Sequence, residues 1–456
     1  MIRLKSVFKN STFSFYNHLN FKSNDMQAVN RKQLFVGSCL ALLVTSLSFG
    51  IRAGILGRLG VQFGLDKSEL ATITATAFWG FPLAVILGGM VVDIIGMKRL
   101  LVYAFILHLA GIVLTIFAGS FSNPFWALFI STLLIGIANG TVEAACNPLV
   151  TALFPENKTT KLNHFHLWFP GGIVIGSLLV LKFDDLFGTG DWVWQLEVAM
   201  MIIPTLIYGL IFSRQKFPLT ERVSSGVSSR EMYRSLVNPL FIFMILCMFG
   251  TAITELFTTQ WVGVLLKNVT ENSILILTTT TGIMVIGRAF AGPIVHRLAP
   301  QGVLLASAVV AALGLYLLGN SSGNMIFVGA LVFGIGVCYF WPTMIGFVAE
   351  TLPKTGAVGI NLMGGAGMFA VSLYTIVMGG VYDNLIAKQL PAGADVKLYN
   401  SPDATAQMKT ALDEANRAAG PEIINTTLVI PLILIVAFAA LYFYMRNRKK
   451  PALQTA

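Results

Sequence analysis

Long apolar stretches, separated by short polar gaps, follow one another along almost the whole chain. Twelve of them come close to or exceed the roughly 20 residues that a helix needs to cross a hydrocarbon core of about 30 Å. Backbone amides in lipid must be paired within the segment, and the stretches lack the strict alternation of barrel strands, so each is predicted to be a helix. The predicted spans are approximately 33–57, 70–95, 99–119, 124–153, 164–182, 192–213, 237–265, 272–296, 301–319, 324–350, 357–385 and 424–445.

The composition agrees with this pattern and excludes a soluble globular fold. Of the 456 residues, 55% are hydrophobic and 11% are charged, and the mean hydropathy is +0.75. The fold class is therefore predicted to be an all-α membrane protein. The spacing GxxxxGK[ST] that would hold the phosphates of ATP does not occur, so a gradient is the expected source of energy. Four cysteines, Cys39, Cys146, Cys247 and Cys338, fall inside predicted spans without the spacing of a metal site, so we expect no metal and no cofactor.

The basic residues predict the orientation of the spans. Of the 31 Lys and Arg residues, 6 lie in residues 1–32, 15 in the remaining loops of the same side together with the C-terminal tail, 8 on the opposite side and 2 within spans. This excess places both termini in the cytoplasm of a cell inner (plasma) membrane, and it accounts for the net charge of +10 without nucleic acid as a partner. Residues 1–32 have no apolar core, so no signal peptide is expected. Two interpretations of residues 1–25 stay open: translation starting at Met26, or a basic arm on anionic lipid.

One polar stretch divides the chain into two halves. Residues 214–236 are rich in Ser and basic side chains, and they separate 33–213 from 237–445. Weak internal similarity accompanies the division, since Pro148 in span four has a counterpart in Pro342 of span ten, and Gly89 with Asp93 is matched by Gly292 with His296. We therefore predict twelve transmembrane helices in two pseudo-symmetric six-helix bundles, with cytoplasmic tails at 1–32 and 446–456.

Residues 386–422 form the longest predicted outer loop. The segment AQMKTALDEANRAA within it is rich in helix formers, and Asp395, Asp403, Asp413 and Glu414 make it acidic. A short surface helix over the outer face is predicted, with a disordered insertion as the alternative. Small residues at Gly136 and Gly140 in span four predict close helix packing.

The gap between spans two and three carries a recognisable motif. Residues Gly89–Arg99 read GMVVDIIGMKR, and this spacing resembles the loop signature of the major facilitator superfamily. The resemblance implies a monomeric secondary transporter that works by alternating access, and not an enzyme. It also implies that Asp93, Lys98 and Arg99 latch the inner face. A tight turn with basic residues facing the cytoplasm is the simpler interpretation of the motif.

Glu143, near the middle of span four, is the clearest polar residue inside the predicted membrane. An ionisable side chain there costs roughly 2.5 to 3.5 kcal/mol on insertion scales, so it needs a partner or a hydrated cavity. Asn139 and Asn147, four residues to either side, share its helical face. The region resembles the fucose–proton symporter group of sugar porters, which implies that Glu143 couples protons to substrate. The alternative is a buried glutamate that only bonds a neighbouring helix.

Span one departs from that group, because it has no acidic residue and instead carries Arg52 about 20 residues from its inner end. Arg52 either reaches to the outer surface or orients an anionic group of the substrate. Under the second interpretation a sugar acid is a candidate substrate. In span seven, Glu255 is predicted to be the second proton-coupling acid in the cavity. Gln260 and Trp261 lie further out and suit a hydroxylated ring, although Trp261 also fits an interfacial belt.

Further candidates lie at the inner ends of spans. Asn361 in span eleven is a candidate for substrate binding. Arg288 is predicted to pair with Glu350 and to close the gate of the second half. His164 and His166 are predicted to be gate or loop residues.

The sequence thus predicts a secondary active transporter of a small hydrophilic solute, most simply a proton-coupled monosaccharide importer surrounded by membrane lipid. The main alternative is an organic-anion or sugar-acid carrier that uses Arg52. Drug efflux is disfavoured because span four lacks the arginine that proton-coupled drug antiporters place near its start. A solute receptor that does not transport is disfavoured because no large cytoplasmic domain is predicted.

Overall fold

The computed structural model describes residues 29–447 except 189, 191, 267–272, 392–393, 395 and 400–403. Most of the predicted N-terminal tail, with Met26, lies outside the described residues, and so do Asp395, Asp403 and residues 448–456. All the regular secondary structure in the described part of the chain is helical, as predicted.

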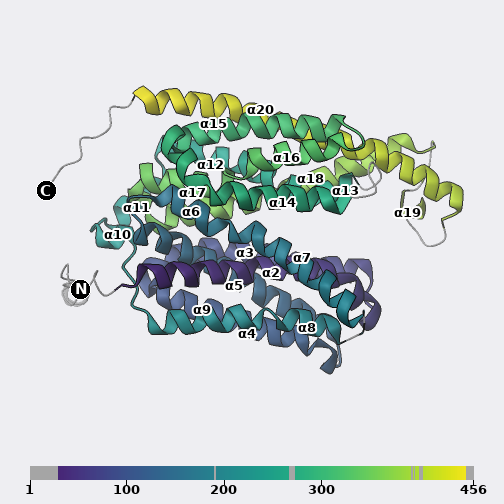
Figure 1. The fold of residues 1–456 in the computed structure, drawn as a ribbon, viewed down its shortest axis with the longest axis horizontal. Helices are drawn as coiled ribbons and strands as arrows, with labels where there is room; N and C mark the ends of the chain where they lie inside the picture. Colours follow the sequence, from purple (N-terminus) through teal and green to yellow (C-terminus); the bar gives the residue numbers. More distant parts are fainter. Residues whose placement is uncertain are drawn as a thin grey trace, which may run out of the picture.

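The first half runs from α2 to α9 and occupies the lower part of Figure 1, except for α6, which lies beside α17 of the second half. Its helices are α2 (Arg31–Phe63), α3 (Lys67–Ile95), α4 (Met97–Ile116), α5 (Pro124–Leu153), α6 (Lys158–His166), α7 (Trp168–Phe187), α8 (Val193–Ala199) and α9 (Ile202–Arg214), with a 3₁₀ turn, η2 (Ala118–Ser120), between α4 and α5. Two short helices, α10 (Glu221–Ser224) and α11 (Ser229–Leu236), connect this half to the next.

The second half occupies the upper part of the same view (Figure 1). It contains α12 (Pro239–Ala252), the π-helical segment η3 (Ile253–Phe257), α13 (Thr258–Leu265), α14 (Ser273–Ala289), α15 (Ala291–Asn320), α16 (Met325–Val337), α17 (Phe340–Thr351), the 3₁₀ turn η4 (Pro353–Thr355), α18 (Gly356–Gln389), α19 (Val396–Tyr399) and α20 (Ala406–Asn447).

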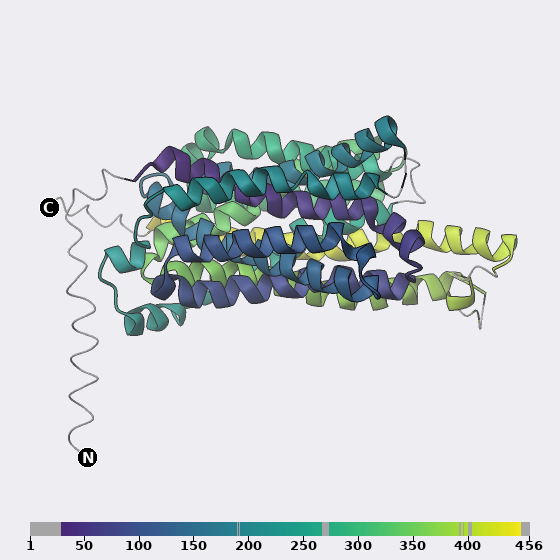
Figure 2. The same cartoon turned by 90° about the horizontal axis from the view of Figure 1, so that it is seen from below.

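The helices run roughly parallel to one long axis, which gives the molecule two ends (Figures 1 and 2). We call the end where α2 begins and α20 finishes the terminal face; α10 and α11 lie there. The other end, where α19 and the start of α20 project, is the opposite face. Within the described residues, eleven helical stretches are long and apolar enough to cross a membrane, and α14 adds a shorter apolar stretch, Ile276–Ala289. This confirms the predicted all-α membrane fold.

Local sequence signals explain where several spans begin and end. Asp66 and Glu69 form a capping box at the start of α3, with backbone-to-carboxylate distances of 2.8 and 2.9 Å. Pro124 and Pro239 occupy the first turns of α5 and α12. The N–H groups of a first turn have no partner within the helix, so a proline there removes no helical hydrogen bond.

The outer segment 386–422 differs from its predicted boundaries. The outer loop expected over 386–422 is shorter, because α18 continues to Gln389 and α20 already begins at Ala406. The predicted surface helix is therefore the first part of the 42-residue α20. It is held there by a small apolar cluster of its own, in which Leu412 and Ala415 pack with Ile386 and Leu390.

The closest helix packing in the first half joins α3 to α5 through glycines. A Cβ added at Gly136 would come within 2.8 Å of the Ala77 Cα atom, and one at Gly140 would collide with the Phe81 carbonyl oxygen. Because these obstacles are backbone atoms, they cannot rotate away. The packing predicted from this pair of small residues is confirmed.

Gly140→Ala should therefore lower the free energy of unfolding by about 1–3 kcal/mol, because the extra methyl group forces α3 and α5 apart. Gly57→Ala is the matched control, since a Cβ at Gly57 would meet nothing within 4 Å and Ala favours a helix. Thermal unfolding in detergent measures both variants. Equal melting temperatures for the two would contradict the packing argument.

Candidate functional site

A buried polar cluster lies on the first half where it meets the second. Glu143 of α5 is 2% exposed, and its Oε2 atom accepts a hydrogen bond of 2.9 Å from Asn147 Nδ2. Asn147 Oδ1 in turn lies 2.9 Å from His166 Nε2, so that ring nitrogen carries the donated hydrogen. His166 Nδ1 then faces Glu143 Oε1 across 4.0 Å. These three side chains form one continuous polar group.

A second buried cluster belongs to the other half. Arg288 of α14 donates from Nη2 to Glu255 Oε1 over 2.6 Å, and the Trp341 backbone N–H donates to Glu255 Oε2 over 3.2 Å. Arg288 Nε also donates to the Cys338 carbonyl over 2.6 Å. Glu255 and Arg288 are both 2% exposed. Glu255 lies in the π-helical segment η3, and such segments frequently occur at functional sites.

One hydrogen bond joins the two clusters. Arg288 Nη1 donates to the backbone carbonyl of His166 over 2.9 Å. The guanidinium thus uses all three of its nitrogens, on Glu255, Cys338 and His166. Together the clusters contain two carboxylates, Glu143 and Glu255, for one guanidinium.

The halves also exchange a matched pair of asparagine contacts. Asn163 Nδ2 of α6 lies 3.4 Å from Thr343 Oγ1 of α17, and Asn361 Nδ2 of α18 donates to the Ala144 carbonyl of α5 over 2.9 Å. Asn361 lies 198 positions after Asn163, and Thr343 lies 199 positions after Ala144. Each half therefore places an asparagine against the corresponding helix of the other, as pseudo-symmetric bundles would. The Oδ1 atoms of both asparagines are buried and have no hydrogen-bond partner among the described residues.

Charged contacts close the terminal face around α10. Asp93, at the end of α3, accepts hydrogen bonds from Arg222 Nε and from the Thr220 hydroxyl, both at 2.5 Å. Lys98 donates to the carbonyls of Ser213 and Gln215 over 2.8 and 3.0 Å. Arg99 is exposed. Nothing in the sequence pattern distinguishes Arg222 from the other basic residues of the connecting segment, so its contact with Asp93 was not predicted.

The predicted pair between Arg288 and Glu350 is wrong. Glu350 Oε1 instead accepts from the backbone N–H of Thr159 over 2.9 Å and from its hydroxyl over 2.6 Å. The reason is depth: Arg288 is enclosed with Glu255, whereas Glu350 is exposed near the end of α17. Beside it, Lys158 of the first half bridges the Ala349 carbonyl at 3.0 Å and Glu221 at 2.5 Å.

The structure places the predicted residues His166 and Asn139 in environments that differ from those expected. His166 is part of the buried cluster and not a loop residue, whereas His164 is half-buried. Asn139 is fully buried and bonds His108 Nε2 at 2.8 Å and Ser48 Oγ at 3.1 Å, with no hydrogen bond to Glu143. His108 is held by Tyr208 at 2.9 Å. His108 and Ser48 are polar residues within apolar spans, and that position in the sequence indicates a buried polar contact of this kind.

Arg52 lies over an aromatic cluster of the first half. Its guanidinium carbon is 5.4 Å from the centroid of the Phe49 ring, and Nη2 donates to the Ser48 carbonyl over 3.3 Å. Phe49 packs against Phe78 of α3 and Phe169 of α7. Arg52 Nη1 is buried and finds no hydrogen-bond partner within the described residues.

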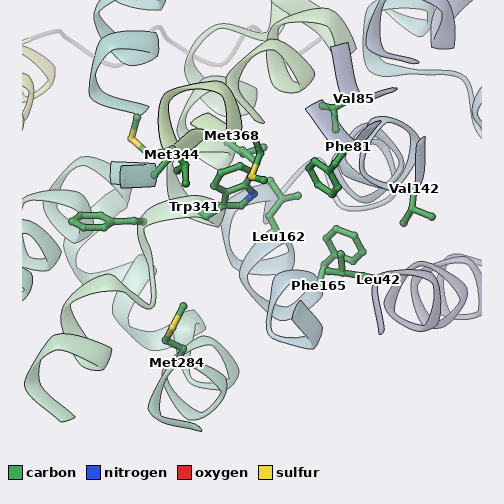
Figure 3. Packing of buried hydrophobic residues seen from close by; sticks show 14 of the residues in the cluster. Leu42, Phe81, Val85, Val142, Leu162, Phe165, Met284, Trp341, Met344 and Met368 are labelled. Carbon is green, nitrogen blue, oxygen red and sulfur yellow. The ribbon is translucent and has the colours of Figure 1, made fainter. Parts of the chain in front are cut away.

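Aromatic side chains of the second half lie at different depths. Trp261 stacks on Phe257 with ring centroids 6.3 Å apart, and its neighbour Gln260 is exposed. Trp341 is 6% exposed; Figure 3 shows it beside Met368, facing Leu162 of the first half. Its backbone N–H bonds Glu255, so the indole is an apolar surface near the Glu255 cluster.

Two helical halves that meet through a buried polar cluster and a set of breakable contacts define a membrane transporter. The family model of the Major Facilitator Superfamily matches residues 38–375. The chain belongs to the major facilitator superfamily, whose members are secondary transporters and not enzymes.

Curated relatives match shorter parts of the chain. The facilitated glucose transporter member 10 of solute carrier family 2 from Danio rerio is 27% identical over 37% of this chain and 32% of its own length. The D-xylose transporter of Levilactobacillus brevis is 24% identical over 40% of this chain and 39% of its own. The probable anion transporter 1 of Oryza sativa is 27% identical over 28% and 23%. The chain thus spans about a quarter to two fifths of these relatives.

Solved structures match nearly the whole fold. The fucose:proton symporter FucP of Escherichia coli aligns with a TM-score of 0.66 at 17% identity, covering 91% of this chain and 98% of its own. The proton:xylose symporter XylE aligns with a TM-score of 0.66 at 14% identity, covering 90% and 99%. At these identities the similarity is one of fold.

Arg288→Leu should lower the free energy of unfolding by about 3–5 kcal/mol, because it leaves Glu255 buried without a cation. Adding Glu255→Gln to that variant should restore most of the loss, since the amide carries no charge. Thermal unfolding of both single variants and the double variant in detergent measures the coupling. If the two single losses simply add, the residues do not act as a pair.

Proposed function

We propose that this transporter imports a monosaccharide or a small derivative together with protons. The observation that carries the proposal is the continuous polar group at the meeting of the halves. It links Glu143, Asn147 and His166 to Glu255 and Arg288 through the bond between Arg288 Nη1 and the His166 carbonyl. Its composition suits proton binding, and its position suits coupling to the motion of the halves.

The charge balance of the cluster favours Glu143 as the residue that binds the proton. Arg288 is bonded directly to Glu255, whereas the direct polar contacts of Glu143 are with the Asn147 amide and the His166 ring. An uncompensated carboxylate in a buried site is costly, so Glu143 is protonated whenever the site is closed and dry. It can release that proton once the site is open to water. Glu255 is then the second coupling residue, because its pairing with Arg288 responds to charge nearby.

Alternating access explains how the proton and the substrate move together. The contacts of Lys158, Thr159 and Asn361 hold the halves together towards the terminal face. Rocking of the halves must break these contacts and the bond from Arg288 to His166. Substrate and proton between the halves would then be exposed to the terminal side. The latch of Asp93 on Arg222 opens in the same step, and Lys98, Arg99 and Glu350 belong to the same face.

A hydroxylated ring fits the chemistry around the cluster. Carboxylate and amide oxygens accept hydrogen bonds from hydroxyl groups, and the Trp341 indole supplies an apolar surface for the C–H side of the ring. We assign Glu143, Asn147, Glu255 and Asn361 to this inner part of the site, and Gln260 and Trp261 to its entrance. Asn139 bonds His108 and Ser48 and makes no hydrogen bond to Glu143, so we do not assign it to this part of the site. The names of the glucose and xylose relatives and of the fucose and xylose symporters point to the same substrate class.

The terminal face is assigned to the cytoplasm of the inner (plasma) membrane. The excess of Lys and Arg on that side of the chain supports this assignment. An inward proton gradient then drives import. The transporter is assigned as a monomer, with membrane lipid around it.

A carrier of organic anions or sugar acids is the second candidate, and Arg52 is the observation in its favour. Phe78, which packs on Phe49, shares a face of α3 with Pro82 and Ile86, and these lie close to Gly365 of the second half. Arg52 thus lies near the meeting of the halves with Nη1 unpaired. A free guanidinium nitrogen there can bond a carboxylate. The anion transporter among the relatives is consistent with this candidate.

Glu143→Gln should retain exchange of a labelled sugar across the membrane but lose accumulation driven by an imposed proton gradient. The amide keeps the hydrogen bonds, whereas it cannot bind and release a proton. Counterflow and gradient-driven uptake in proteoliposomes measure the two activities, with Asp413→Asn on exposed α20 as the control. Loss of folded protein, or wild-type accumulation by the variant, would contradict the assignment.

Arg52→Ala should reduce binding of D-glucuronate and D-galacturonate by about tenfold or more, because a charge-assisted hydrogen bond is lost. Binding of D-glucose and D-xylose should stay unchanged. Ligand-induced thermal stabilisation at two pH values measures both sets, with Arg52→Lys as a control that keeps the charge but not the planar fork. Unchanged binding of every ligand would remove Arg52 from the site.

A further inference from the structure

A groove at the terminal face has no role in the transport cycle described above. It has a volume of about 450 Å³ and lies between the start of α2 and the end of α9. Its lining combines polar and apolar side chains from these two helices: Asn30, Lys32, Gln33, Val36, Leu210, Ile211, Arg214 and Gln215. The volume falls within the range of about 300–1,000 Å³ that is usual for small-molecule sites.

The rim of the groove is basic and its charge is not neutralised. Lys32 and Arg214 are exposed, and no carboxylate of the described residues pairs with either. Arg31, which precedes Lys32 in the sequence, already faces Glu156 at 3.7 Å. Lys98 donates to the carbonyls of Ser213 and Gln215, so two of the carbonyl groups at the end of α9 that would repel an anion are already bonded. The rim is therefore suited to one or two negative charges.

The floor of the groove is apolar and open to the surroundings. Val36 is 43% exposed and Leu210 is 51% exposed, and Ile211 lies beside them. Both residues lie one to two turns inside the ends of membrane-spanning helices, so hydrocarbon is the medium that covers them. A ligand that fills the groove must therefore carry an apolar chain below an anionic group.

We infer that this groove binds a membrane phospholipid with an anionic headgroup. The phosphate lies between Lys32 and Arg214, and the acyl chains follow Val36, Leu210 and Ile211 into the bilayer. The N-terminal residues of the chain are an unsuitable occupant, because Arg3, Lys5, Lys9 and Lys22 would repel the basic rim. The lipid joins the start of α2 to the end of α9, which leads directly into the segment that carries Arg222.

The test compares lipids on the full-length protein purified in detergent. Short-chain phosphatidylglycerol and phosphatidylcholine are titrated separately, and binding is followed by thermal stabilisation and by native mass spectrometry. Phosphatidylglycerol should bind the wild type at least tenfold more tightly than phosphatidylcholine. The variant Lys32→Gln/Arg214→Gln should weaken phosphatidylglycerol binding about 25-fold, since each basic residue near the surface contributes about fivefold. Each single substitution should weaken phosphatidylglycerol binding about fivefold.

The control variant Arg230→Gln/Arg234→Gln removes the same charge from exposed positions of α11 on the same face, and it should bind like the wild type. Equal binding of the two lipids by the wild type would overturn the inference. An equal loss of affinity for phosphatidylglycerol in the two double variants would overturn it as well. Glycerol 3-phosphate, the headgroup alone, should not compete with the lipid. Full competition would mean that the rim holds a free phosphate and that the apolar floor is not used.

Discussion

The Arg288 guanidinium is the group on which the rest of the site depends. It is buried in lipid-surrounded protein, bonds a carboxylate on η3 and the Cys338 carbonyl between α16 and α17 in its own half, and reaches the His166 carbonyl in the other half. A charge in such a place is tolerated only while it is paired and hydrogen-bonded. The half-to-half contact is therefore not an optional one: it can be broken only if another acceptor, or water, takes its place.

The two asparagine contacts lie at the same interface between the halves and depend on the same closed arrangement. Asn163 and Asn361 cross the interface reciprocally with one acceptor atom left unpaired on each. Unpaired buried acceptors cost free energy, so this closed arrangement is held by the neighbouring bonds and not by the asparagines alone. Structures of this kind open readily once a few polar contacts exchange partners with water, which is what a transporter requires.

Much of the fold could be predicted from the sequence, because lipid imposes long apolar helices and a lone carboxyl such as Glu143 is conspicuous within them. The pairing of Arg288 could not. It depends on the π-helical segment that holds Glu255, and on the depth at which Arg288 of α14 meets it, and neither is encoded in a hydrophobic pattern. Likewise, the contact of Arg222 with Asp93 joins positions far apart in the chain. Contacts between distant helices need the three-dimensional register that hydropathy leaves open.

Proton movement measured together with sugar uptake tests the central claim most directly. Wild-type proteoliposomes in a weakly buffered medium are given D-glucose, D-xylose or L-fucose, while external pH and labelled uptake are recorded at the same time. The account predicts that a sugar which is taken up also raises the external pH, because each molecule enters with a proton. Uptake of labelled sugar with no change in external pH would contradict it.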